Sequence, residues 1–569
     1  MYFNLFRQHT ASELSGFFDD VFWSRTVLIE CHQADAIRHA VVALGALYKT
    51  LETTTESPPS SPDAAGVTPS NAADRAANHW EVALDQYSSA CHAVGTVDPA
   101  NPRSQRTCLI ASVLLACFDS FIGDHQQAIR QIQTGLKQLW LLRDSRNSQT
   151  VLQVAPDGSY VSQPAVPEPV EDELLQMFTR LAIQAKSYDM AFHFPKPYVI
   201  YLLPSTEAGF SELSSSDTSG SSPSSPAGSS DVDSPVTVHQ DPIPVRFSSL
   251  RDARLAWDTL CEDMLRFTEK MFQSASGPPN ILPSSMRRYG IHFQARLTGW
   301  SAAFGPLLNS RTRPDVSSQE KAGIAVLKMF QIMGQILFFM TFVDSEMQFD
   351  NFQPHFAEIV SLAFEVYGVP SFGPSHIKAS FSADLGIVPP LYVVATKSRD
   401  RMLRRQAIQL LRSSARREGM WDSELMARIG TWVMEIEEQG DGEEDKLRSW
   451  QNSAGMPLTP VDSPAPSTVT LPHRQRSPGV DFGDAPLGPG GNARWDVRRE
   501  SSTSSVRSSA SATSGSLPPA PPPIPAEKRV LVKSCEFDLR GHVATLKCGT
   551  RGLVAGKVDH KTQVTRITW

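Results

Sequence analysis

Four side chains near the C-terminus have the chemistry to hold a zinc ion: Cys535, His542, Cys548 and His560. Thiolates and imidazoles are the usual ligands of tetrahedral zinc sites, and at least two ligands of a structural site normally lie a few residues apart. These four follow one another at intervals of six to twelve residues, which matches no zinc-binding pattern. We therefore expect no metal site in this chain.

The motifs of hydrolytic and phosphoryl-transfer enzymes are missing. The sequence contains no His-Glu-x-x-His and no Gly-x-Ser-x-Gly. Residues 552–558 resemble a phosphate-binding loop, but the segment is one residue short and ends in valine where a metal-binding hydroxyl is needed. His39, His79 and His125 have apolar neighbours and are interpreted as structural histidines. The sequence thus predicts no enzyme, no catalytic residue and no cofactor.

The densest basic cluster contains six arginines: Arg401, Arg404, Arg405, Arg412, Arg416 and Arg417. Such a cluster is a candidate nuclear import signal or phosphate-contact surface. The alternative is a solvated helix face that is partly paired with Asp400 and Glu418, and we favour it because charged runs are common on exposed helices. A nuclear location therefore does not rest on this cluster.

The elements that position these residues belong to a long chain of ordinary composition. Its 569 residues are 41% hydrophobic and 20% charged, with a net charge of −7. A chain of this length is larger than a domain with a single hydrophobic core usually is. The negative net charge provides no general attraction to nucleic acid or anionic lipid. The seven cysteines are scattered through apolar runs, which is typical of reduced thiols in an intracellular protein. The N-terminus has no signal-peptide pattern.

Apolar residues recur at steps of three and four, which predicts an all-α fold, a compact bundle of many helices. Residues 108–118 are apolar on nearly all sides, as in a central helix, and Gly123 is expected to end that helix. Asp124 is expected to cap the next helix, whose inner face would include Trp140. Residues 108–142 should therefore form a helical hairpin.

Three further helices carry clear signals. Residues 322–343 are apolar enough for a membrane span, but a polar stripe that includes Lys328 favours a buried helix of a protein without membrane spans. Pro389 and Pro390 are expected to open one helix, and Asp422 is expected to cap the last long one.

Segments rich in Ser, Pro and Gly divide the chain. We expect disorder in the linkers 53–71 and 206–241 and in the segment 440–527, because they cannot bury enough apolar surface to fold. The remaining parts are the two halves of a helical domain, 1–205 and 242–439, and a tail, 528–569. Strand-like runs and glycine turns predict a small β unit in the tail. The alternative is that the tail comes from a mispredicted exon.

Five helical stretches together resemble a known domain: 23–52, 80–142, 173–185, 247–254 and 385–423. The strongest is the last, which we call the C-terminal block and which runs from Leu385-Gly386-Ile387-Val388-Pro389-Pro390 to Arg416-Arg417-Glu418-Gly419-Met420-Trp421-Asp422-Ser423. These stretches are similar to the fungal-specific transcription factor domain, which follows the zinc binuclear cluster (Zn(II)2Cys6, or C6 zinc finger) in many fungal regulators.

The resemblance implies a regulatory domain of a nuclear transcription regulator, with other transcription proteins as partners. It also suggests a small-molecule effector, a homodimer and shuttling with the cytoplasm. Family members that bind DNA hold two zinc ions in six cysteines. This chain has no Cys-x-x-Cys, so the finger is either lost or encoded upstream. Zinc, DNA contact and recognition of RNA polymerase II promoters are expected only in the second case.

Two other functions stay open. One is a finger-less interaction module that binds other regulators through apolar helix faces and never touches DNA. The other is a helical domain that senses a metabolite in an apolar pocket.

Overall fold

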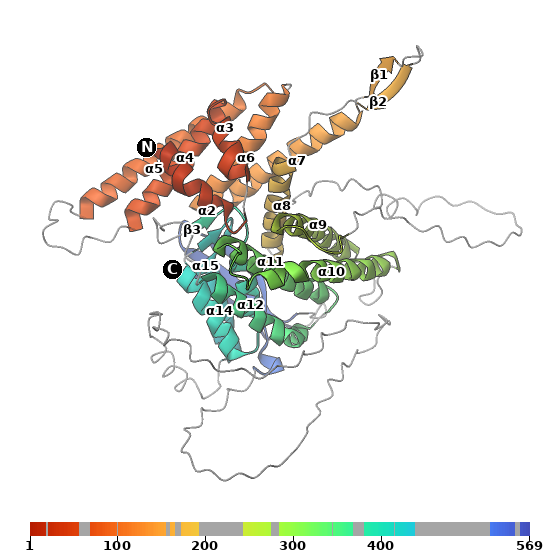
Figure 1. The fold of residues 1–569 in the computed structure, drawn as a ribbon. Helices are drawn as coiled ribbons and strands as arrows, with labels where there is room; N and C mark the ends of the chain where they lie inside the picture. The colour runs from red at the N-terminus through yellow and green to blue at the C-terminus, as the bar shows by residue number, and fades with distance from the viewer. Residues whose placement is uncertain are drawn as a thin grey trace, which may run out of the picture.

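The computed structural model describes residues 1–18, 21–55, 69–98, 101–148, 150–154, 160–164, 172–192, 243–274, 284–343, 345–367, 380–414, 416–438, 524–551 and 558–569. These residues are mainly helical, with three small sheets (Figure 1). The expected fold class, all-α with a small β-rich C-terminal part, is confirmed. The linker 206–241 and most of the segment 440–527 lie outside the described residues.

The N-terminal helices form one layer, drawn in red to orange in Figure 1. Its long helices are α4 (Asp35–Thr55), α5 (Pro69–Gly95) and α6 (Pro102–Ile122), and α4 packs on both of the others. Short helical turns lead into the layer: α1 (Tyr2–Leu5), η1 (Phe6–Thr10), α2 (Ala11–Ser15), η2 (Phe22–Thr26) and α3 (Val27–Glu30). Helix α4 ends at Thr55 and α5 begins at Pro69, so the two ends of the expected linker 53–71 are helical. Residues 56–68 lie outside the described part.

Helices α6 and α7 (His125–Ser148) form the expected hairpin. Gly123 ends α6 with a φ of 85°, in the left-handed region that favours glycine. The Asp124 carboxylate accepts a hydrogen bond from the Gln127 amide at 3.0 Å and so caps α7. The prediction for Trp140 is wrong, because its side chain is 44% exposed. It lies about 100° around the helix from the buried Leu139, so the two cannot share one face.

The remaining helices build the larger, C-terminal layer. They are α8 (Asp172–Phe192), α9 (Leu250–Ser274), α10 (Ser284–Ser310), α11 (Ser318–Met340), η5 (Glu346–Phe352), α12 (Gln353–Tyr367), α13 (Val388–Lys397), α14 (Arg401–Ser414), α15 (Ser423–Glu438) and η6 (Ala526–Lys528). By length and apolarity α11 and the segment Arg103–Ile122 could each cross a membrane, but 72% of each apolar window is buried inside the fold. Both are therefore core helices, as expected for α11.

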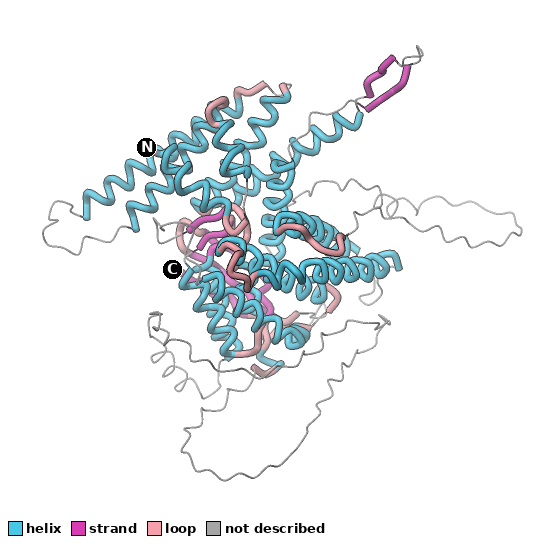
Figure 2. Tube along the Cα trace, in the orientation of Figure 1, coloured by secondary structure: helices cyan, strands magenta, loops and turns pink. Residues whose placement is uncertain are grey.

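Three sheets complete the fold. A hairpin of β1 (Thr150–Val154) and β2 (Tyr160–Pro164) extends α7. In the second sheet β3 (Ser380–Ser382) runs parallel to β4 (Arg416–Glu418), which pairs antiparallel with β5 (Trp421–Asp422). The third is antiparallel, in the order β6 (Leu531–Asp538), β7 (Val543–Gly549) and β8 (Gln563–Thr568). Figure 2 shows the strands of the other two sheets lying among the helices, apart from the β1–β2 hairpin. The β unit expected in the tail is confirmed, and β7 is an additional strand.

Candidate functional site: the C-terminal block

The C-terminal block surrounds the start of α13. Pro389 and Pro390 occupy its first turn, as predicted from their missing N–H groups and fixed φ. The backbone N–H groups of Gly386, Ile387 and Val388 therefore need acceptors from outside the helix.

Glu418, on β4, supplies these acceptors. Its carboxylate accepts hydrogen bonds from the amides of Gly386 at 2.8 Å, Ile387 at 3.0 Å and Val388 at 2.9 Å. The side chain is completely buried, and its negative charge lies at the positive end of the helix. Burial raises the pKa of Glu418, while the guanidinium of Arg416, 3.3 Å away, and the three N–H donors act to lower it. The carboxylate thus links two segments that are 30 residues apart.

Two glycines make room for this link. A Cβ on Gly386 would lie 2.5 Å from both a Glu418 oxygen and the ring of Phe17. Gly419 has a φ of 56°, and a Cβ there would lie 2.2 Å from the amide of Gln184. No other residue type fits either position without displacing a buried neighbour, so both glycines belong to the packing of the block.

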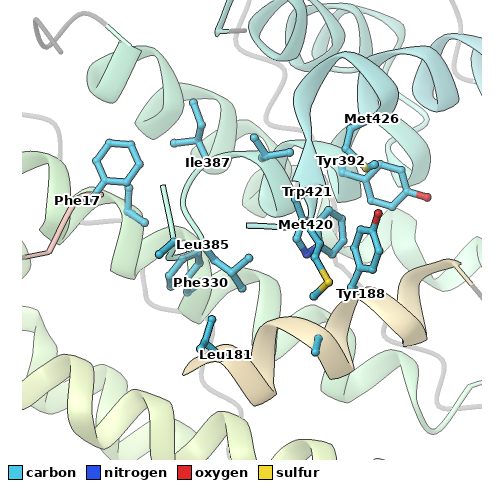
Figure 3. Close-up of a cluster of buried hydrophobic side chains, with 14 of the residues drawn as sticks. Phe17, Leu181, Tyr188, Phe330, Leu385, Ile387, Tyr392, Met420, Trp421 and Met426 are labelled. Atoms are coloured by element: carbon cyan, nitrogen blue, oxygen red, sulfur yellow. The ribbon is translucent and has the colours of Figure 1, made fainter. Parts of the chain in front are cut away.

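An aromatic cluster lies beside the carboxylate. Figure 3 shows Tyr188 from α8 next to Trp421 and Met420, with Tyr392 from α13 close by. Ring centroids lie 5.5 Å apart for Tyr188 and Trp421, and 5.8 Å apart for Tyr392 and Trp421. Phe192 joins at 5.5 Å from Trp421. These rings connect the N-terminal half to the C-terminal block.

The structure divides the predicted arginine cluster between a helix and a strand. On α14, Arg404 is completely buried against Glu437 at 2.6 Å, and Arg401 is 5% exposed. Burial lowers the pKa of Arg404, and Glu437 acts against that. Arg405 pairs with Glu438 at 2.5 Å, and Arg412 donates to the Thr431 hydroxyl at 3.0 Å. The described arginines of α14 therefore face inward as well as outward.

Arg416 and Arg417 lie on β4, so the interpretation of the whole cluster as one solvated helix face is wrong. The guanidinium of Arg416 stacks over the ring of Phe17 at 4.6 Å. Arg417 pairs with Asp422 at 2.8 Å and donates to the carbonyl oxygen of Phe121 at 2.5 Å. The role in nuclear import or phosphate contact stays a prediction, with Arg412 the exposed member.

Sequence reasoning missed a second buried charge network. The guanidinium of Arg254 lies between the rings of Phe18, at 4.3 Å, and Phe330, at 5.2 Å. It pairs with Asp258 at 2.7 Å and with Asp384 at 3.0 Å. Arg254 and Asp258 have the spacing of neighbours on one helix face, so the sequence indicates that this ion pair can form. The pair of Arg254 with Asp384 has no such spacing, and the sequence gives no indication of it.

The residues considered for zinc or catalysis are not brought together. His39 bonds to Gln86 at 2.8 Å and His79 to the Tyr2 hydroxyl at 2.9 Å, both between helices. Among the described residues, no three His, Cys, Asp or Glu side chains gather in a group that could hold a metal ion. What the described part offers is a packed scaffold in which buried ion pairs join distant segments.

The comparisons with known proteins identify a regulator-like region. No family model matches this chain, and no solved structure matches it. A stretch of 99 residues is 38% identical to the Aspercryptin biosynthesis cluster-specific transcription regulator atnN of Emericella nidulans. The match covers 17% of this chain and 15% of that relative. The chain therefore contains a region similar to part of a fungal transcription regulator.

Proposed function

We propose that this chain provides the regulatory domain of a fungal transcription regulator of the zinc-cluster type. The single observation that carries the proposal is the 38% identity to the fungal regulator over 99 residues. The proposal includes a nuclear location, other transcription proteins as partners and no enzymatic activity. Contact with DNA and recognition of RNA polymerase II promoters would require a zinc finger, and the proposal does not include them for the described residues.

The geometry of the C-terminal block supports this proposal. The block that carries the strongest resemblance is a buried junction in which Glu418 joins α13 to β4 and Gln184 donates to the Ala383 carbonyl at 3.2 Å. Such a junction gives neighbouring elements a fixed relative position, which a surface that binds partner proteins requires.

A tethering experiment tests the proposal. The full chain is fused to an unrelated DNA-binding domain, and a reporter with intermediate basal expression reveals either activation or repression. We expect the fusion to change expression several-fold relative to the DNA-binding domain alone. The Gly386→Val variant, which fills the space beside Glu418, should lose the effect, whereas Gly305→Ala, with open space around its Cβ position, should keep it. Reporter levels equal to those of the DNA-binding domain alone would contradict the proposal.

A further inference from the structure

The C-terminal tail differs in charge from the rest of the chain. Residues 528–569 contain nine basic and three acidic residues, a net charge of +6, whereas the whole chain carries −7. The preceding 527 residues therefore carry −13. The two parts are electrostatically complementary, which favours their association.

The tail uses this charge in ion pairs with the helical body. Arg529, 3% exposed, pairs with Glu437 of α15 at 3.2 Å, and the amide of Val530 donates to the same carboxylate at 2.9 Å. Arg551 pairs with Glu346 of η5 at 2.9 Å. Burial acts to raise the pKa of Glu346, but Lys397 and Arg551 together lower it below its ordinary value, which favours the charged carboxylate in this pair.

The tail also contacts the N-terminal half of the body. Arg540 pairs with Asp124 at 3.0 Å, between α6 and α7. Leu539, 3% exposed, packs so closely on Gly123 that a Cβ there would lie 2.7 Å from the leucine Cβ. Gly123 is therefore needed both for its left-handed φ and for this contact.

A single phenylalanine of the tail enters the aromatic cluster. The ring centroid of Phe537 lies 4.9 Å from His125, 5.9 Å from Tyr188 and 5.6 Å from Phe192. The tail thus covers part of the cluster beside the C-terminal block. We call the body residues that receive it, namely Glu346, Glu437, Asp124, His125, Tyr188 and Phe192, the docking surface.

We propose that the tail is an intramolecular ligand of the helical body, a clamp that joins its two halves and can leave without unfolding it. The docking surface selects an aromatic side chain flanked by arginines, as Phe537 is by Arg529 and Arg540. The tail also has interactions of its own, because β6, β7 and β8 pair with one another and Lys533 pairs with Asp559 at 2.7 Å. The inference is independent of the proposed function.

Cleavage of the full chain tests the clamp. A site for a sequence-specific protease is inserted after residue 480, outside the described residues, and the folded protein is cut. We expect the C-terminal piece to elute with the body in size-exclusion chromatography. After the cut no peptide bond joins the two, and the contacts between the tail and the docking surface keep them together. If the wild-type piece elutes separately, the clamp is refuted.

Variants then separate docking from folding. Arg529→Ala and Phe537→Ala should weaken retention of the cut piece at least tenfold, while the helical circular dichroism of the body stays at the wild-type level. Glu346→Gln changes the body and leaves the tail sequence intact, so it controls for misfolding of the tail and should weaken retention in the same way. Arg566→Ala, on the exposed face of β8, should have no effect. Unchanged retention in Arg529→Ala, Phe537→Ala and Glu346→Gln would overturn the proposal. So would a loss of helical circular dichroism from the body whenever the cut piece is released.

Discussion

Replacing Glu418 with glutamine removes one negative charge from the start of α13 with little change in size. One carboxylate oxygen accepts from Gly386 and Val388, and the other accepts from Ile387 and faces Arg416. Glutamine keeps a single acceptor oxygen. Its NH2 group would therefore point at a buried N–H donor or at the guanidinium.

The magnitude follows from these contacts. Hydrogen bonds to a charged acceptor contribute about 1.5–3 kcal/mol each and neutral ones about 0.5–1.5 kcal/mol, while a buried donor left without a partner costs about 1–3 kcal/mol. Two weakened bonds lose about 2–3 kcal/mol and one lost acceptor costs about 1–3 kcal/mol, which gives about 3–6 kcal/mol. A typical domain is stable by about 5–15 kcal/mol, so Glu418→Gln should remove a large share of the free energy of unfolding.

Urea unfolding at pH 7, followed by circular dichroism, measures this loss. The control is Glu424→Gln on α15, whose partner Arg428 is 40% exposed, and such a surface pair contributes less than about 1 kcal/mol. A free energy of unfolding for Glu418→Gln within about 1 kcal/mol of wild type would refute the reasoning. It would mean that burial already keeps the carboxyl group protonated.

Three further outcomes are expected. Gly386→Ala should lower the melting temperature by several degrees, whereas Gly305→Ala, with nothing within 4 Å of its Cβ position, should not; equal melting temperatures would contradict the packing argument. Burial raises the pKa of Asp119 from 3.8 to about 7, against the hydrogen bond from Tyr87, so the folded state binds the proton more tightly and stability should fall as pH rises from about 4 to 7. Asp119→Asn should remove that fall, so the variant should be more stable than wild type by up to about 4 kcal/mol at pH 8 and should differ little at pH 4. Denaturation at both pH values measures the difference, and a wild-type stability independent of pH would contradict it. Trp140→Ser should change the free energy of unfolding by less than about 0.5 kcal/mol, since the side chain is 44% exposed, and a larger loss would show that it is packed.

Local signals in the sequence predicted the helices and their ends. Gly123 ends α6, and the carboxylates of Asp124 and Asp422 accept amide hydrogen bonds at the starts of α7 and α15. Each signal acts within a few residues, through a left-handed φ or a side chain that bonds to nearby backbone. This is why the fold class and these boundaries could be read before the structure.

The contacts that hold the C-terminal block and the tail could not be predicted in this way. Strands β3 to β5 have two or three residues each, too few to show alternation. Glu437 and Arg529 are 92 residues apart, and Arg540 and Asp124 are 416 apart. A sequence contains no local pattern for a pair that only the tertiary fold brings together.

The most direct test of the central claim is a transcript measurement in the native cell. The gene is deleted and restored as wild type or as Gly386→Val, and RNA sequencing compares the strains. We expect a defined set of transcripts to change on deletion, to return with the wild-type gene and to stay changed with the variant. A deletion strain whose transcripts match the parent under all growth conditions tried would contradict a role in transcription regulation.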